Sequence, residues 1–150
     1  MTSATPKTFV FIDASVWIAA SGSSTGGSSL VLDICQGRHF AALCSERVLL
    51  EAQTNIRNKL PVEALVRFYQ LLAASAPRIV PPATPDEETT YKALAGPKDA
   101  HVIASAMRAP AVYLITLDRT HHANEAVRNA GLPFQVMLPG EFIQAVLSPA

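Results

Sequence analysis

The sequence lacks any excess of charge of either sign. Its 150 residues include 12 lysines and arginines and 12 aspartates and glutamates, so the formal net charge is zero. A neutral protein has no overall attraction to nucleic acid or to an anionic membrane. Binding of a polyanion would therefore depend on a local basic patch, or on a cation bound among acidic side chains.

Cysteine is also scarce. Cys35 and Cys44 are the two cysteines of the chain, and neither belongs to a CxxC motif or to a Cys/His spacing typical of zinc sites. This argues against a disulfide scaffold and a zinc site, and favours buried free thiols in a reducing compartment.

Long hydrophobic runs are missing as well. No stretch approaches the roughly twenty apolar residues that a membrane span requires, and residues 1–7 lack the apolar run of a signal peptide. We therefore expect a cytoplasmic protein with a disordered tail at 1–7. A hydrophobic content of 49% with 16% charged residues predicts one domain over 1–150 with a substantial core.

Short apolar runs alternate with helical segments along the chain. The predicted strands are 8–13, 39–44, 78–80, 112–115 and 134–136. The predicted helices are 14–20, 30–36, 45–59, 61–75, one that starts at 84–88, 99–108, 120–130 and 140–147. This alternation predicts an α/β fold, a three-layer α/β/α arrangement with a mainly parallel central sheet. The Gly/Ser-rich stretch 21–29 is predicted to be a flexible loop.

Four acidic residues stand at predicted strand or helix ends: Asp13, Glu51, Asp99 and Asp118. In an open parallel sheet the carboxyl ends of the strands line the ligand crevice. Two carboxylates about 4 Å apart repel each other by about 4 kcal/mol at an effective dielectric constant near 20. A cluster of such groups therefore predicts a hard divalent cation with oxygen ligands, Mg²⁺ or Mn²⁺. Bound there, the ion would activate a water for phosphodiester hydrolysis.

Polar residues near these acids have predicted supporting roles. Ser15 and Thr116 each lie two residues from an acid and are candidates to orient its ligating oxygens. Asn55, one helical turn after Glu51, would hold a water or a phosphate oxygen. The candidate contacts to substrate phosphates are Lys98, Arg119, Arg57 and Lys59.

The segments that carry the acids resemble the PIN-domain family, which includes VapC-type toxins and many metal-dependent ribonucleases. The matching segments are FIDASV at 11–16, SERVLLE at 45–51, KDAHVIASA at 98–106 and LITLDR at 114–119, and they follow the family's order. The resemblance implies a Mg²⁺- or Mn²⁺-dependent endoribonuclease, the toxin of a toxin–antitoxin pair, with RNA as substrate, a separate antitoxin as partner and a homodimeric state. Two positions depart from the family pattern: Ser15 replaces a frequent asparagine, and Thr120 replaces a further acid.

Other interpretations of these residues remain open. Taken singly, Asp13 and Asp99 are also suitable helix caps, and Glu51 and Asp118 are also ordinary surface or turn residues. The pair His121-His122 indicates a polar helix start or a contact to substrate. The rival functions are a non-catalytic PIN-like module that binds RNA or protein, and a phosphotransfer domain. The phosphatase type of the latter requires an aspartate where Ser15 stands.

Overall fold

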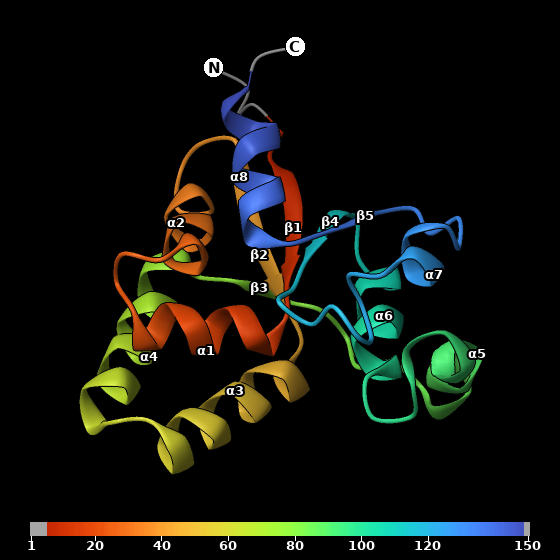
Figure 1. Ribbon diagram of the computed structural model, residues 1–150, viewed down its shortest axis with the longest axis horizontal. Coiled ribbons are helices and arrows are strands. Elements are labelled where there is room, and N and C mark those ends of the chain that lie inside the picture. The colour runs from red at the N-terminus through yellow and green to blue at the C-terminus, as the bar shows by residue number, and fades with distance from the viewer. Residues whose placement is uncertain (1–5, 149–150) are drawn as a thin grey trace.

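The computed structural model describes residues 6–148 and shows a five-stranded parallel sheet flanked by helices (Figure 1). The strand order is β3-β2-β1-β4-β5. The strands are β1 (Thr8–Ile12), β2 (Phe40–Cys44), β3 (Arg78–Ile79), β4 (Ala111–Ile115) and β5 (Gln135–Met137). The predicted α/β fold with a parallel central sheet is confirmed. Most of the predicted tail at 1–7 lies outside the described residues.

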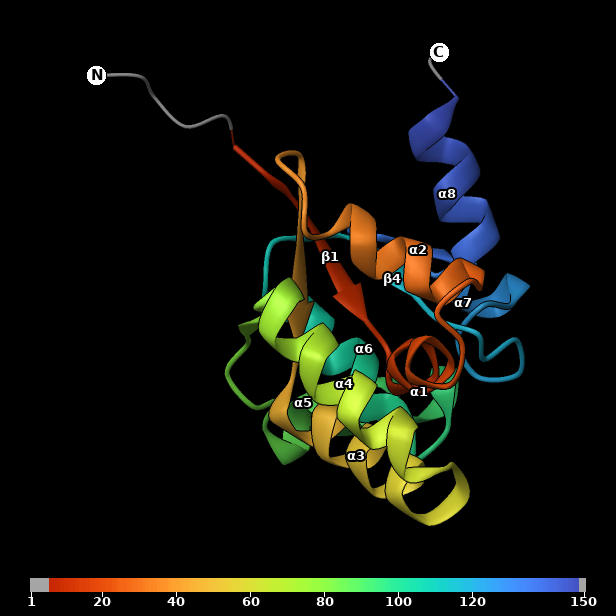
Figure 2. The ribbon, with the colours of Figure 1, turned by 90° about the vertical axis from the view of Figure 1, so that its left-hand side faces the viewer.

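Helices cover both faces of the sheet. They are α1 (Ala14–Gly22), α2 (Gly27–Ile34), α3 (Glu46–Lys59), α4 (Val62–Ser75), α5 (Pro85–Ala95), α6 (Ala100–Met107), α7 (Glu125–Arg128) and α8 (Pro139–Leu147). Helices α1 to α4 pack together on one side, where α3 and α4 lie side by side (Figure 2), while α5, α6 and α7 lie on the other. Helix α8 packs against α2 and β5. Within residues 6–148, no helix combines the length and the apolar character that crossing a membrane requires.

Helices cover the central strand β1 on both faces. Val10, Phe11 and Ile12 are completely buried, so successive side chains, which point to opposite faces, are all covered by helices. On the α1 side, Trp17 and Phe68 pack edge to face with ring centroids 6.2 Å apart. The end of β1 is therefore part of the packed core, which positions the residue that follows it.

The predicted flexible loop at 21–29 is too long. Helix α1 continues to Gly22 and α2 begins at Gly27, so the connection is confined to residues 23–26. Ser21 and Ser29 are buried because their hydroxyls donate hydrogen bonds to backbone carbonyls: Ser21 to Trp17, and Ser29 to Ala20 and Ser23. Serine hydroxyls that bond to the backbone in this way are compatible with a helix, which the composition did not indicate.

The predicted helix at 120–130 is also too long, because only Glu125–Arg128 is helical. The carboxylate of Asp118 accepts hydrogen bonds from the backbone N–H groups of Thr120 and His121, each at 2.9 Å. An aspartate that bonds to backbone groups two or three residues ahead favours a turn over a helix. The side chain of Asn124 then caps the short helix through the N–H of Val127.

Candidate metal centre

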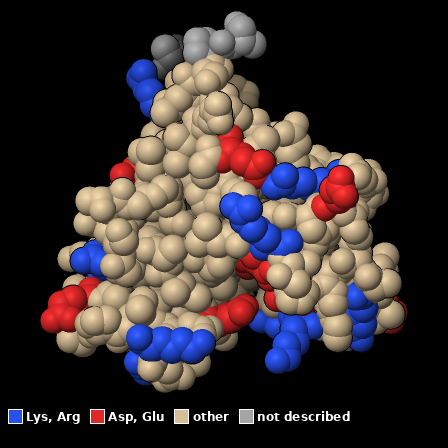
Figure 3. Space-filling view, viewed as in Figure 1, with Lys and Arg blue, Asp and Glu red and all other residues tan. Residues whose placement is uncertain are grey.

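The four predicted acids occupy the carboxyl end of the sheet and the adjacent helices. Asp13 directly follows β1, and Asp118 lies three residues after β4, the neighbouring strand. Glu51 lies in the second turn of α3, and Asp99 is the residue before α6. On the face shown in Figure 3, acidic side chains lie near the centre with lysines and arginines around them.

Asp13 is buried, with 6% of its surface exposed, and its carboxylate accepts three hydrogen bonds from neutral donors of the described chain. Its Oδ1 accepts the N–H of Ala14 at 2.8 Å, which caps α1. Its Oδ2 accepts the hydroxyls of Ser15 at 2.9 Å and Thr116 at 2.7 Å. The residue is therefore a helix cap and, at the same time, a fixed carboxylate at the strand end. Neutral donors fix its oxygens, and no ion pair within residues 6–148 includes Asp13.

The hydroxyls of Ser15 and Thr116 connect this carboxylate to the chain after β4. Ser15 Oγ accepts the N–H of Leu117, and Thr116 Oγ1 accepts the N–H of Asp118, each at 3.0 Å. Each hydroxyl thus accepts a hydrogen bond from a backbone N–H group and donates one to the carboxylate of Asp13. This arrangement fixes the position of Asp118 relative to Asp13, although the two are 105 positions apart in the sequence.

His121 lies between two of the carboxylates. Its ring Nδ1 is 3.1 Å from Asp118 Oδ2 and 3.3 Å from Asp99 Oδ2. Desolvation alone would raise the pKa of Asp118, but hydrogen bonds from the backbone and ring of His121, with the charges of His122 and His121, hold this pKa below its usual range. Asp99 makes no side-chain capping bond to its own helix. The interpretation of Asp99 as an ordinary helix cap is therefore wrong for its side chain.

The pKa of Glu51 reflects the negative charges near it. Partial desolvation, followed by the repulsion of Asp13 and then Asp99, raises the pKa of Glu51 above its ordinary value of 4.5, although Arg47 acts in the opposite direction. The carboxylates of three distant segments are thus close enough to act on one another. Their mutual repulsion is the electrostatic condition that a bound cation would relieve.

The donor set of this site suits a divalent cation. Among the described residues, Asp99, Asp118 and His121 each offer a ligand atom within 4.8 Å of the other two, while Asp13 and Glu51 lie outside this tight group. Carboxylate oxygens are the ligands that Mg²⁺ and Mn²⁺ prefer, and an imidazole nitrogen is also acceptable to Mn²⁺. The residues present therefore fit such an ion.

The sequence did not single out His121 as a member of this group. A helix through 120–130, as predicted, would have placed the residue on a regular surface turn. The structure instead packs its ring against Gly96, which has a φ of +87°, and a Cβ at that glycine would lie 3.4 Å from the His121 ring. The available signal was the spacing of three residues from Asp118, which alone does not distinguish a ligand from a surface histidine.

The remaining predicted residues are more peripheral. Asn55 donates its side-chain N–H to the backbone carbonyl of Glu51 at 2.9 Å, so its amide is used within its own helix rather than on a carboxylate. The four residues predicted to contact phosphates all have exposed side chains: Lys98, Arg119, Arg57 and Lys59. Their roles stay predictions.

Replacement of Glu51 by glutamine is expected to have opposite effects on the metal-free and metal-bound protein. A raised pKa in the folded state favours the protonated form, so the wild-type protein loses stability as the pH rises through the pKa of Glu51. The E51Q variant lacks this loss, and near pH 7 without metal it is expected to gain up to about 1 kcal/mol in unfolding free energy, a small value because the residue is exposed. Urea unfolding at pH 4 and pH 7, without and with Mn²⁺, measures both effects.

With Mn²⁺ present, the same variant is expected to be stabilised less than the wild type, because it lacks the negative charge of Glu51 near the ion. Equal stabilisation of both proteins by Mn²⁺, together with an unchanged pH dependence, would mean that Glu51 is an ordinary solvated residue.

Comparison with known proteins identifies the family of this chain. A search of curated proteins found no match. The family model described as PIN domain matches residues 9–120, the part of the chain that runs from β1 to just beyond Asp118 and contains all four acids. Because this match covers well over half of the 150 residues, the chain belongs to the PIN domain family.

Proposed function

We propose that the protein is a metal-dependent endoribonuclease that hydrolyses phosphodiester bonds of RNA, with Mg²⁺ or Mn²⁺ as its cofactor. PIN domains are generally metal-dependent nucleases and usually bind a divalent ion. The observation that carries the proposal is the group of Asp99, Asp118 and His121, whose ligand atoms lie within 4.8 Å of one another. The raised pKa of Glu51, to which the charges of Asp13 and Asp99 contribute after desolvation, supports the inclusion of these acids.

In this proposal, each group of residues has a distinct task. Asp99 and Asp118 hold the ion together with His121, and Asp13 and Glu51 complete the negative field around it. When bound, the ion lowers the pKa of a water and offsets negative charge in the transition state. Ser15 and Thr116 keep the carboxylate of Asp13 in one orientation. Loss of such supporting hydrogen bonds typically lowers metal affinity or activity 10- to 100-fold.

The exposed basic residues would position the substrate. Lys98 and Arg119 each adjoin a proposed ligand in sequence, and Arg57 and Lys59 lie in the last turn of α3. Their charges would attract the phosphates on either side of the scissile bond, which the acids alone would repel. Asn55 would assist if its amide left the carbonyl of Glu51 when RNA binds.

We further propose that the protein is the toxin of a type II toxin–antitoxin pair, that it acts in the cytoplasm and that it forms a homodimer. Support comes from the resemblance of its segments to VapC-type toxins and from exposed apolar side chains on α3 and α4, namely Leu50, Val62, Val66 and Tyr69. Exposed apolar side chains on two adjacent helices would suit a surface that a partner chain covers. An antitoxin would inhibit best by presenting an arginine to the acids.

RNA cleavage by the purified protein tests the proposal. We expect cleavage in Mg²⁺ or Mn²⁺, none in EDTA, and a loss of at least about 100-fold in the D99N variant, which keeps the size of the side chain but removes the charge. The measurement is gel analysis of a broad panel of single-stranded and structured RNAs.

The same assay separates the rival function. Tight RNA or protein binding without any wild-type cleavage over the whole panel would favour a non-catalytic module. Cleavage that persists in EDTA, or an unchanged rate in D99N, would contradict the metal-dependent mechanism. Absence of an aspartyl-phosphate mimic with beryllofluoride would exclude the phosphotransfer domain.

A further inference from the structure

A hollow lies next to the end of β3. It has a volume of about 190 Å³ and lies between the start of α3, the segment that follows β3, and α6. Its apolar wall is formed by Ile79, Val80, Pro82 and Ala83. Polar side chains of α3, α5 and α6 form the rest of the lining, including Arg47, Glu88 and His101.

His101 is the residue that indicates a ligand. Only 5% of its surface is exposed, and its ring Nδ1 has no hydrogen-bond partner among residues 6–148. A buried polar atom without a partner costs about 1–3 kcal/mol, so native structures normally provide one. Ser45 and Ser105 also line the hollow and are each 3% exposed. A molecule with a hydrogen-bonding group would supply the missing partner at His101.

The charges around the hollow disfavour an anion. Arg47 already pairs with Glu88 at 2.8 Å, and Glu46 adds a second carboxylate to the lining. A phosphate would meet no free cation among these residues and would be repelled by both glutamates. The chemistry favours a neutral, compact group with an apolar face and a polar edge, which describes a nucleobase.

The hollow also lies within reach of the acids. Asp99 directly precedes α6, and His101 follows it by two residues on that helix. Arg47, which also lines the hollow, lies one helical turn before Glu51 on α3. A nucleotide adjacent to the acidic cluster could therefore turn its base toward this hollow.

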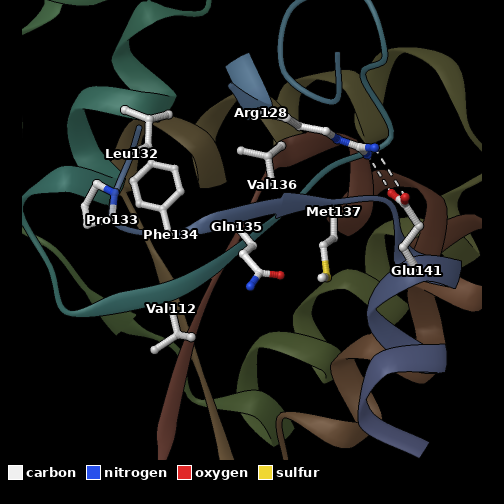
Figure 4. Close-up of a pocket in the computed structure, with 9 residues that line it drawn as sticks. All are labelled: Val112, Arg128, Leu132, Pro133, Phe134, Gln135, Val136, Met137 and Glu141. Atoms are coloured by element: carbon white, nitrogen blue, oxygen red, sulfur yellow. Dashed lines mark hydrogen bonds and ion pairs between the residues drawn. The ribbon is translucent and has the colours of Figure 1, made fainter. Parts of the chain in front are cut away.

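A larger hollow beside β5 is a weaker candidate for a binding site. Its volume is about 570 Å³, and its lining includes the apolar side chains of Leu132, Phe134 and Met137 (Figure 4). Its two charged residues, Arg128 and Glu141, bind each other at 2.6 Å. Its lining includes none of the buried polar atoms within residues 6–148 that lack a partner, in contrast to the hollow near His101.

We propose that the hollow beside His101 binds one unpaired nucleobase of the RNA strand whose backbone lies at the acids. This inference rests on the proposed function, because it takes RNA as the substrate. The base would lie against Val80 and Ala83 and would form a hydrogen bond with His101 Nδ1. The hollow would thus contribute to the choice of cleavage position by selecting single-stranded RNA, in which bases are free to leave the stack.

A filled hollow tests this proposal. Ala83 is half-buried and lines the hollow, so A83L fills it with little risk to the fold; A109L makes the same change at another half-buried position outside it. Binding is measured by fluorescence anisotropy in Ca²⁺, with intact RNA verified on gels. The probes are a labelled random-sequence RNA 12-mer and an abasic ribose-phosphate 12-mer. We expect A83L to weaken binding of the RNA about tenfold, with no change for the abasic probe or for A109L.

Other results overturn the proposal in distinct ways. Equal affinity of A83L and wild type for the RNA, or equal losses on both probes, would show that no base enters the hollow, while the proposed nuclease function would stand. No binding of either probe by the wild type would contradict both. If A83L does not fold, NMR of the wild-type histidines decides: the His101 ring signals must shift with the RNA and not with the abasic probe.

Discussion

The D13A variant is expected to lose at least about 100-fold in RNA cleavage and about 2 kcal/mol in unfolding free energy. The loss of activity follows from the removal of a fixed carboxylate from the acidic cluster. The loss of stability follows from the missing cap of α1 and from the hydroxyls of Ser15 and Thr116, which lose their acceptor. Relief of repulsion toward Glu51 offsets part of this cost. Cleavage assays and urea unfolding measure the two effects separately.

The D13N variant separates charge from structure. Asparagine also caps helices well, so this variant is expected to stay within about 1 kcal/mol of the wild type while it loses activity as D13A does. D33N serves as the control, because it removes the same charge from an exposed position on α2. Full activity in D13N would show that the charge of Asp13 has no part in the reaction and that the residue is only a helix cap.

The fold was predictable because its strands are unusually clear. Runs such as Val10 to Ile12 are apolar without alternation, which indicates strands covered on both faces, and the structure buries them completely. The helical segments between them then impose parallel pairing. The failures at 21–29 and 120–130 have one cause: polar side chains formed backbone hydrogen bonds whose geometry depends on the fold, so composition alone assigned the wrong extent.

The strand-end acids were predictable for the same reason, since the residue after a buried parallel strand must emerge at the carboxyl edge. The contact partners of these acids were less so. Ser15 and Thr116 were found by their spacing, because each lies two residues from a strand-end acid. His121 was missed because its position depends on the turn that Asp118 creates and on the space beside Gly96. Neither is visible as a periodic pattern.

The hydroxyl of Thr116 links the two strand-end acids. Thr116 is completely buried; its hydroxyl accepts the N–H of Asp118 and donates to Asp13. Valine has almost the same shape but neither hydrogen-bonding capacity. Its introduction would leave the buried carboxylate with one donor fewer and the Asp118 N–H without this acceptor. Both acids would then be free to change their relative position.

The T116V variant is therefore expected to lose about 1–3 kcal/mol in unfolding free energy and 10- to 100-fold in Mn²⁺ affinity. Urea unfolding without metal and isothermal titration calorimetry with Mn²⁺ measure these two quantities. The T116S variant keeps the hydroxyl and should retain most of the metal affinity, although the missing methyl group lowers stability somewhat. If T116V and T116S bind Mn²⁺ equally well, the hydroxyl does not orient Asp13 for the ion, and its two hydrogen bonds serve only the packing of β1 against β4.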